Sequence, residues 1–180
     1  MYSDKKKIMR VEKTALEGVL RVTPPTNFKD SRGDYVELYN KDLYRKAGVE
    51  QEFIQDDISA SKKNVLRGIH GDAVTWKLVC CLFGEFYLVV LNNDSESQQY
   101  GNWASFNLSA EKYEQILIPP KFGNGHLILS EKAIFHYKQS TYYDPESQFT
   151  IKWDDRRFNI YWPTKNPILS KRDMNNDTSD

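Results

Sequence analysis

Histidine and cysteine are scarce in this chain of 180 residues, which holds three histidines and two cysteines. The two cysteines, Cys80 and Cys81, are neighbours in a strand-like segment, so their side chains should point to opposite faces. That geometry disfavours a disulfide between them, and their spacing is not that of a cysteine metal site. We therefore expect both cysteines to fill the core.

The sequence also lacks an excess of charge of either sign and a long run of apolar residues. The 25 lysines and arginines balance 25 aspartates and glutamates, so no overall field would hold the chain on nucleic acid or an anionic membrane. No segment approaches the roughly 20 apolar residues of a membrane span, and the polar first residues lack the apolar stretch of a secretory signal. These absences predict a cytoplasmic protein with neither nucleic acid nor a membrane as partner.

Short strand-like segments, rich in β-branched and aromatic residues and separated by turn-forming residues, are abundant instead. Eleven strands are predicted, at residues 18–23, 34–39, 52–59, 64–70, 77–83, 85–92, 103–109, 113–119, 126–130, 133–139 and 149–153. A short helix at 40–48, capped by Asn40, and a turn that begins at Ser109 complete the prediction.

Many evenly spaced strands are typical of a sandwich or barrel of the jelly-roll type, which includes the cupins. The predicted fold class is therefore all-β, with few short helices. At this length the chain is most simply one domain, which we place at residues 1–173. The polar residues 174–180 are expected to form a disordered tail.

The few histidines give little support for a metal site. Metal-binding barrels of this kind usually carry two histidines one residue apart on a strand, with a carboxylate and a later histidine. Here the residue two after His70 is Asp72, while His126 and His136 lie far along the chain. An acid/base role without metal suits His70 better, because histidine titrates near neutral pH. We expect neither a metal nor a cofactor.

Eight sequence blocks between Asn27 and Asp173 resemble the dTDP-4-dehydrorhamnose 3,5-epimerase family of cupin-fold enzymes. In chain order they are FKDSRGDYVE, FIQDDISAS, VLRGIHG, KLVCCLFGE, LSAEKYEQILIPPKFGNG, YKQSTYYDPES, IKWDD and WPTKNPILSKRD. Any one block is a weak signal, but their shared order and spacing make the resemblance specific. It implies a cupin-type barrel, a homodimer, and an isomerase that inverts C3, C5 or both in a nucleotide-linked 4-keto sugar.

The resemblance assigns four residues to catalysis. His70 in RGIHG is implied as the base, and Asp173 in LSKRD as the carboxylate that orients it. Lys77 in KLV would stabilise the enolate oxygen, and Tyr137 in YK would return a proton to the other face of the sugar. This set suits the reaction, because inversion next to a carbonyl needs a base, an oxyanion stabiliser and an acid on the opposite side.

The resemblance also assigns residues to substrate binding, some of them across the dimer interface. They are Arg32, Glu37, Gln55, Ser59, Arg67, Asn124, His126, Tyr143 and Lys171. Arginine suits a diphosphate because its planar fork donates two hydrogen bonds to phosphate oxygens. An aromatic ring such as that of Tyr143 suits a nucleotide base, on which it stacks.

Three departures from the family pattern bear on the substrate. Asp57 stands where Asn is usual, GD follows His70 where an aromatic residue and Gln are usual, and Asn124 stands where a histidine is expected. His126 would partly replace the missing ring if the strand continues, unless Gly125 forms a bulge. The HGD and GNGH variants resemble the branch that acts on GDP-linked 6-deoxy-4-keto heptoses in capsule synthesis.

Three alternatives stay open beside a GDP-heptose epimerase. The first is a dTDP-4-dehydro-6-deoxyglucose 3,5-epimerase. The second is a nucleotide-sugar 3,4-ketoisomerase on the same barrel, although such enzymes usually carry HAH where this chain has HGD. The third is a barrel that binds sugar nucleotides without turnover, which the presence of His70 and Tyr137 disfavours.

Overall fold

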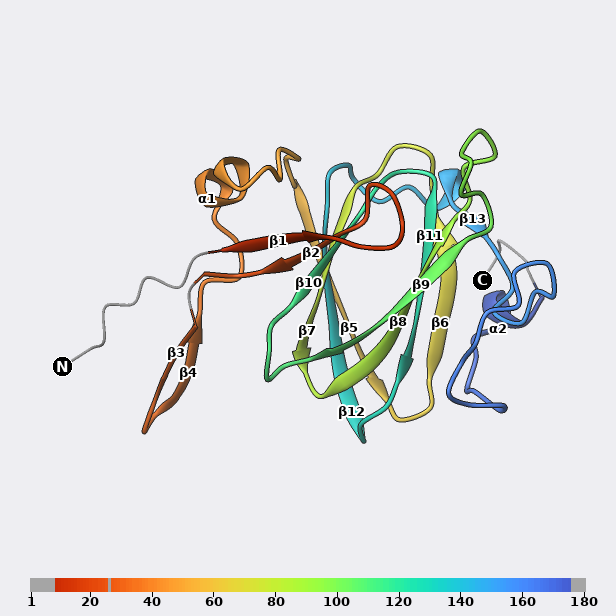
Figure 1. Ribbon diagram of the computed structural model, residues 1–180. Coiled ribbons are helices and arrows are strands. Elements are labelled where there is room, and N and C mark those ends of the chain that lie inside the picture. The colour runs from red at the N-terminus through yellow and green to blue at the C-terminus, as the bar shows by residue number, and fades with distance from the viewer. Residues whose placement is uncertain (1–8, 26, 176–180) are drawn as a thin grey trace.

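The computed structural model describes residues 9–25 and 27–175 (Figure 1). The elements in this part of the chain are β1 (Arg10–Lys13), β2 (Leu20–Thr23), β3 (Asn27–Asp30), β4 (Gly33–Val36), α1 (Lys41–Lys46), β5 (Gln55–Lys62), β6 (Leu66–Gly71), β7 (Lys77–Phe83), β8 (Glu85–Asn92), β9 (Trp103–Ser109), β10 (Gln115–Ile118), β11 (Phe122–Ile128), β12 (Lys132–Gln139), the 3₁₀ helix η1 (Pro145–Ser147), β13 (Phe149–Thr150) and α2 (Lys171–Asn175). The prediction of an all-β fold with few short helices is confirmed.

Two antiparallel sheets form the body of the jelly roll and enclose its main core. The larger has the strand order β1-β2-β10-β7-β12-β5, and the smaller has the order β13-β6-β11-β8-β9. Buried apolar side chains from both sheets meet between them, among them Val79, Phe86, Val90 and Phe135. The hairpin of β3 and β4 is a separate sheet, and it projects away from the barrel (Figure 1).

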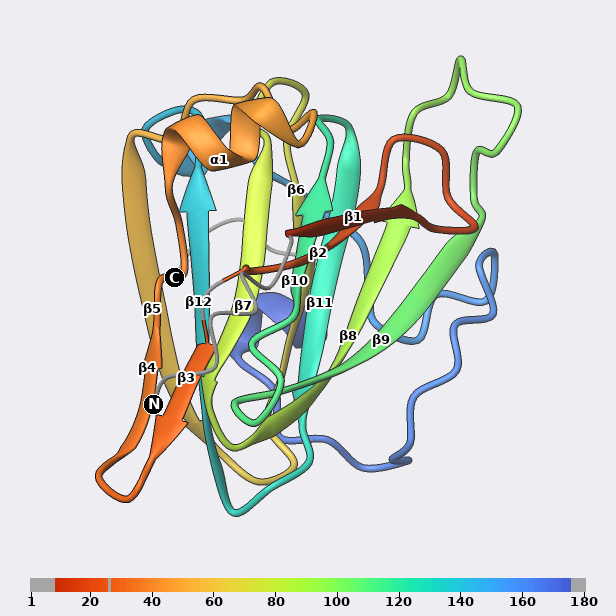
Figure 2. The ribbon, with the colours of Figure 1, turned by 60° about the vertical axis from the view of Figure 1, so that its left-hand side comes forward.

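Each outer face is covered by a further apolar layer. On the larger sheet, Tyr44 of α1 packs with Leu78 and Leu117, and Figure 2 shows α1 across one end of β12 and β7. On the smaller sheet, the chain after β13 contributes Phe158 and Trp162 to a cluster with Leu66, Ile69 and Leu127 from the strands. Within the described residues, no helix combines the length and the apolar character that a membrane crossing requires.

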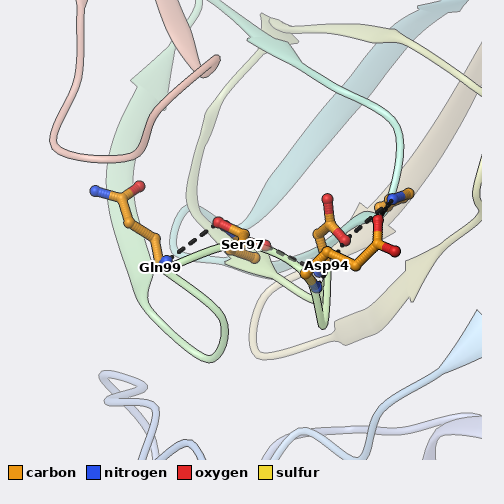
Figure 3. A network of polar contacts seen from close by, with 6 residues as sticks. Asp94, Ser97 and Gln99 are labelled. Atoms are coloured by element: carbon orange, nitrogen blue, oxygen red, sulfur yellow. Dashed lines mark hydrogen bonds and ion pairs between the residues drawn. The ribbon is translucent and has the colours of Figure 1, made fainter.

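The loop between β8 and β9 is held by a polar network (Figure 3). Asn92 accepts from the Asp94 N–H at 2.9 Å and donates to Ser97 Oγ at 3.0 Å, while Lys121 forms an ion pair with Asp94 at 3.1 Å. Ser97 Oγ also accepts from the Gln99 N–H at 3.1 Å. None of these residues lines the cavity described below, so the network shapes a loop at a distance from it.

Strand β12, in the larger-sheet wall of the cavity, follows the predicted alternation of side chains. On β12, Ala133 and Phe135 are buried in the core, so the period of two also turns Tyr137 toward the interior. Lys138, the residue after Tyr137, lies on the other face, where its Nζ contacts Asp56 at 2.7 Å. The direction of the side chains along β12 could therefore be predicted from the sequence.

Several local predictions are confirmed. Asn40 caps α1, since its side chain accepts from the Leu43 N–H at 3.2 Å, and Gly48 follows with a positive φ of 90°. Cys80 and Cys81 are free and buried. The strands predicted at residues 77–83, 85–92 and 103–109 have those bounds in the structure.

Other predictions are wrong at the glycines and at the C-terminus. The strand expected at 126–130 begins at Phe122, because Gly123 and Gly125 are strand residues and not turn residues. A Cβ on Gly123 would lie 2.5 Å from a methyl group of Ile69, so glycine permits close packing there. Residues 174 and 175, expected in a disordered tail, belong to α2, while 176–180 lie outside the described residues.

Candidate active site

A cavity of about 370 Å³ opens into the barrel between the two sheets. Its walls are formed by Gln55, Asp57, Ile58, Ser59, Arg67, His70, Lys77, Asn124, His126, Phe135, Tyr137, Gln139, Tyr143, Gln148 and Arg172. Strands β5, β7 and β12 of the larger sheet supply one wall, and β6 and β11 of the smaller sheet supply the other. The volume is within the range of small-molecule sites, and the lining is rich in polar and charged groups.

His70 on β6 is paired with a buried carboxylate. Its Nε2 lies 2.8 Å from Asp173 Oδ1, and the side chain of Asp173 is only 3% exposed. The carboxylate also accepts from the Gly68 N–H at 3.3 Å and from Ser170 Oγ at 2.8 Å. Because Nε2 faces Asp173, Nδ1 is the ring nitrogen that remains for a ligand in the cavity.

The charge of Asp173 is stabilised by these partners. Burial alone raises the pKa of Asp173, but the hydrogen bond and charge of His70, the Ser170 hydroxyl and the Gly68 N–H together hold that pKa below its ordinary value. The carboxylate is therefore ionised at neutral pH. The ionised carboxylate beside Nε2 fixes the orientation of the imidazole, which leaves Nδ1 free to act as a general base.

A bulge in β6 directs both Arg67 and His70 into the cavity. On a regular strand, residues three apart point to opposite faces. Here Asn124 is opposite His70 while His126 is opposite Arg67, so β6 has one more residue than β11 over this stretch. Gly68 has a φ of +115°, and a Cβ there would lie 2.5 Å from the Cα of Gly125, so glycine is required.

Tyr137 and Lys77 lie on the wall opposite His70, in adjacent strands of the larger sheet. Burial raises the pKa of Tyr137 to about 12, with further contributions from Asp57 and Tyr143, so the phenol is protonated at neutral pH. Lys77 is 8% exposed at the start of β7. Burial lowers the pKa of Lys77, Asp72 opposes this effect, and Arg172 adds to it.

Asn124 and His126 on β11 share the cavity face, as their spacing of two predicted. The β11 register against β8 is continuous through Gly125, so the bulge considered at Gly125 is located in β6 instead. His126 stacks on Phe135 with ring centroids 4.0 Å apart. Burial, supported by the charge of Arg67, lowers the pKa of His126 to about 3, so this ring is neutral.

Besides His70 Nε2, which faces the carboxylate of Asp173, three buried polar atoms of the cavity wall have no hydrogen-bond partner within the described residues. They are Ser59 Oγ, Asn124 Oδ1 and His126 Nε2. Buried polar atoms without a partner are costly, so such atoms at a cavity are suited to the polar groups of a ligand. In the described part of the chain, no three His, Cys, Asp or Glu side chains are placed to hold a metal ion together.

The model of the protein family described as dTDP-4-dehydrorhamnose 3,5-epimerase matches residues 13–180. The chain belongs to this family. Its sequence is 42% identical over 171 residues to the dTDP-4-dehydrorhamnose 3,5-epimerase of Salmonella typhimurium, covering 92% of this chain and 93% of that one. It is 39% identical to the Shigella flexneri protein of the same name, covering 93% and 94%.

Solved structures agree with the family assignment. The dTDP-6-deoxy-D-glucose-3,5-epimerase of Legionella pneumophila, solved with dTDP-4-keto-L-rhamnose, superposes with a TM-score of 0.87 at 34% identity. The match covers 92% of this chain and 90% of that one. The expected cupin-type jelly roll of the dTDP-4-dehydrorhamnose 3,5-epimerase family is thus confirmed.

The structure brings most of the residues assigned from this family to one cavity. His70, Lys77 and Tyr137 line it, with Asp173 directly behind His70. Of the residues assigned to binding, those at the cavity are Gln55, Ser59, Arg67, Asn124, His126 and Tyr143. The assignments from the epimerase family thus converge on one place, although they come from segments far apart in the sequence.

Three residues assigned to binding do not line the cavity of their own chain. The side chain of Arg32 is 82% exposed near the tip of the β3–β4 hairpin, where it forms an ion pair with Asp30. Glu37 follows β4 and accepts from Asn40 Nδ2 at 3.0 Å. Lys171 is exposed on α2, and its neighbour Arg172 reaches the cavity instead.

The sequence reasoning missed several residues of the cavity. Arg172 lines it and donates to Thr150 Oγ1 from Nε and Nη2 at 3.2 and 3.1 Å. Gln139 could have been found, because it stands two residues after Tyr137 on the same strand face. Gln148 lies between η1 and β13, where no periodic pattern indicates the direction of a side chain.

Proposed function

We propose that the protein inverts C3 and C5 of dTDP-4-dehydro-6-deoxyglucose by proton transfer through an enolate. The observation that carries this proposal is the placement of two different proton carriers on opposite walls of one cavity. His70, with Asp173 behind it, comes from the smaller sheet, and Tyr137 comes from the larger sheet. A sugar ring held between them would present one face to each.

Each step has a residue that fits it. His70 Nδ1 removes the proton from the carbon next to the C4 carbonyl, and the electron pair moves into an enolate whose charge rests on O4. The buried ammonium of Lys77 stabilises that oxygen, because a positive charge in a dry site acts strongly on developing negative charge. The Tyr137 hydroxyl then donates its proton to the opposite face of the same carbon, which inverts the centre. The imidazolium of His70 then releases its proton to water, and the phenolate of Tyr137 takes a proton back from water.

The choice of nucleotide is supported by the named relatives, which are described as enzymes of dTDP sugars. The sequence variants HGD at residues 70–72 and GNGH at residues 123–126 favour a second candidate, a GDP-linked 6-deoxy-4-keto heptose, but none of these named relatives is described as acting on such a sugar. We therefore place the dTDP substrate first. Both candidates share the 4-keto group, and so they share the mechanism.

Solvent exchange tests the reaction and the substrate together. Purified protein is incubated in deuterium oxide with dTDP-4-dehydro-6-deoxyglucose or with a GDP-linked 4-keto heptose, without added metal or nicotinamide. We expect deuterium at C3 and C5 of the dTDP sugar, with inversion seen by proton spectra. Exchange confined to the GDP sugar would reverse the order of the two candidates. A loss of exchange after chelation that a divalent ion restores would contradict the mechanism without metal.

We also propose that the protein is a homodimer in which Arg32 serves the partner's cavity. Arg32 lies on a hairpin that projects from the barrel and that also carries the exposed rings of Phe28 and Tyr35. A group that is solvated in its own chain and carried on a projecting hairpin is suited to a site on a second copy. A guanidinium there would bind the diphosphate.

Arg32→Ala is expected to raise KM about ten- to a hundredfold with little change in kcat, since a hydrogen bond to a charged group contributes roughly 1.5–3 kcal/mol. Arg157→Ala is the matched control, because Arg157 forms the same type of ion pair with Asp155 and is 70% exposed away from the cavity. Steady-state kinetics and light scattering at micromolar concentration are the measurements. A fully active monomer, or an unchanged KM in Arg32→Ala, would rule out this assembly.

A further inference from the structure

Asp57 and Tyr137 are direct neighbours across two paired strands. Asp57 on β5 is opposite Tyr137 on β12, and both side chains line the cavity. Directly opposed residues on one face of an antiparallel pair have Cβ atoms about 4.5–5.5 Å apart. The described residues contain no hydrogen-bond partner for the Tyr137 hydroxyl, so it is available to a ligand.

Two glutamine amides fix the Asp57 carboxylate. Gln55 Nε2 and Gln139 Nε2 both donate to Asp57 Oδ2, each at 2.8 Å. The amide of Gln55 is itself oriented, because its Oε1 accepts from the Tyr143 N–H at 2.9 Å. No cation pairs with Asp57 within the described residues, so neutral donors position this carboxylate without cancelling its charge.

We propose that Asp57 is a positioning residue for Tyr137: its charge disfavours the phenolate that is left after proton donation and so promotes the return of Tyr137 to its protonated form. This inference rests on the proposed function of the cavity. After the phenol gives its proton to carbon, a phenolate would stand beside the Asp57 carboxylate. Repulsion between these two negative charges favours the return of a proton from water. Asp57 therefore acts on the proton carrier and not on the substrate.

Each wall of the cavity then carries a carboxylate next to its proton carrier, and the two carboxylates have different effects. Asp173 orients the imidazole of His70, which acts as the base, whereas Asp57 disfavours the anionic form of Tyr137, which acts as the acid. Burial is the largest cause of the raised pKa of Tyr137, and Asp57 is the next. The direction agrees with the geometry, because a nearby negative charge disfavours ionisation of a phenol.

Other titratable groups also line the cavity around Tyr137. They are Lys77 on β7, Arg67 and His70 on β6, His126 on β11, Arg172 on α2 and Tyr143 after β12. Among the described residues, only Asp57 and Tyr143 add to the effect of burial on the pKa of Tyr137. Of these two neighbours, Asp57 is the carboxylate and makes the larger contribution, so we assign the effect to Asp57.

Asp57→Asn removes the charge and preserves the hydrogen bonds. Both glutamine amides donate to the same carboxylate oxygen, so the asparagine carbonyl in that position can accept both. Asp57→Ser is a second variant without the charge, in case the first one disturbs folding. Asp56→Asn is the matched control, because Asp56 is the preceding residue of β5 and contacts Lys138 at 2.7 Å on the other face of the sheet.

Ionisation of Tyr137 is measured on the free protein by ultraviolet difference absorbance, after subtraction of the Tyr137→Phe spectrum in each background. We expect the midpoint to fall by about one pH unit in Asp57→Asn and Asp57→Ser, the size of effect of a close like charge. The Asp56→Asn control should leave the ionisation midpoint of Tyr137 unchanged. An unchanged midpoint in both Asp57 variants would overturn the inference. No substrate is needed, so the outcome does not depend on which sugar the protein takes.

A second readout is the ratio in which the enolate is protonated on the face of Tyr137, which inverts the centre, or on the face of His70, which does not. With Asp57→Asn, Tyr137 is a stronger acid, so the ratio of inverted to non-inverted deuterated sugar should rise at neutral pH. A purely structural role of Asp57 would lower exchange and inversion together and leave this ratio unchanged. That result would also overturn the proposal.

Discussion

His70→Asn is expected to abolish both deuterium exchange and epimerisation. Without the imidazole no group at this position removes the proton next to the carbonyl, so no enolate forms. Proton transfer by a positioned side chain contributes about 10²–10⁴-fold, and the loss in kcat should be of that size. Asparagine keeps a polar side chain of moderate size beside Asp173, which limits the disturbance of the buried carboxylate. Substrate binding should change little.

His136→Asn is the control for this experiment. His136 is also partly buried and lies 3.7 Å from a carboxylate oxygen of Asp56, but it occupies the face of β12 that points away from the cavity. The His136→Asn variant should exchange deuterium into the sugar and invert it at the rate of the unchanged protein. Exchange at the normal rate in His70→Asn would show that another group is the base.

Tyr137→Phe is expected to separate exchange from inversion. The base can still remove a proton and return it to the same face, so deuterium enters the sugar while the inverted product falls by about 10²–10⁴-fold. Phenylalanine keeps the ring that packs against Phe135, with centroids 5.4 Å apart, and removes only the hydroxyl. Mass and proton spectra of the sugar after incubation in deuterium oxide measure both quantities.

Tyr161→Phe controls for the loss of a tyrosine hydroxyl outside the cavity. Tyr161 is 64% exposed and contacts Tyr87 edge to face on the outside of the barrel. Wild-type inversion in Tyr137→Phe would assign proton delivery to a different residue or to water, even with the family membership unaffected. Loss of exchange together with inversion would indicate that Tyr137 takes part in enolate formation.

The sequence by itself determined the fold class, the family and most of the candidate site. Strand periodicity placed Tyr137 on the inner face of its strand, and the turn signals gave three strands their bounds. Ordered sequence blocks identified His70, Lys77 and Asp173 together. These properties are local, or are preserved as motifs, so a linear chain displays them.

Only the tertiary structure decided which of these residues meet. Gly68 and Asp173, 105 residues apart, are joined by a hydrogen bond, and no local pattern predicts that distance. The bulge in β6 turns Arg67 and His70 to one side, against the alternation that a regular strand would give them. The tertiary structure also shows that Arg172, and not Lys171, reaches the cavity. Side-chain direction at bulges and helix ends depends on packing between distant segments, whereas the period of a regular strand is a property of the strand itself.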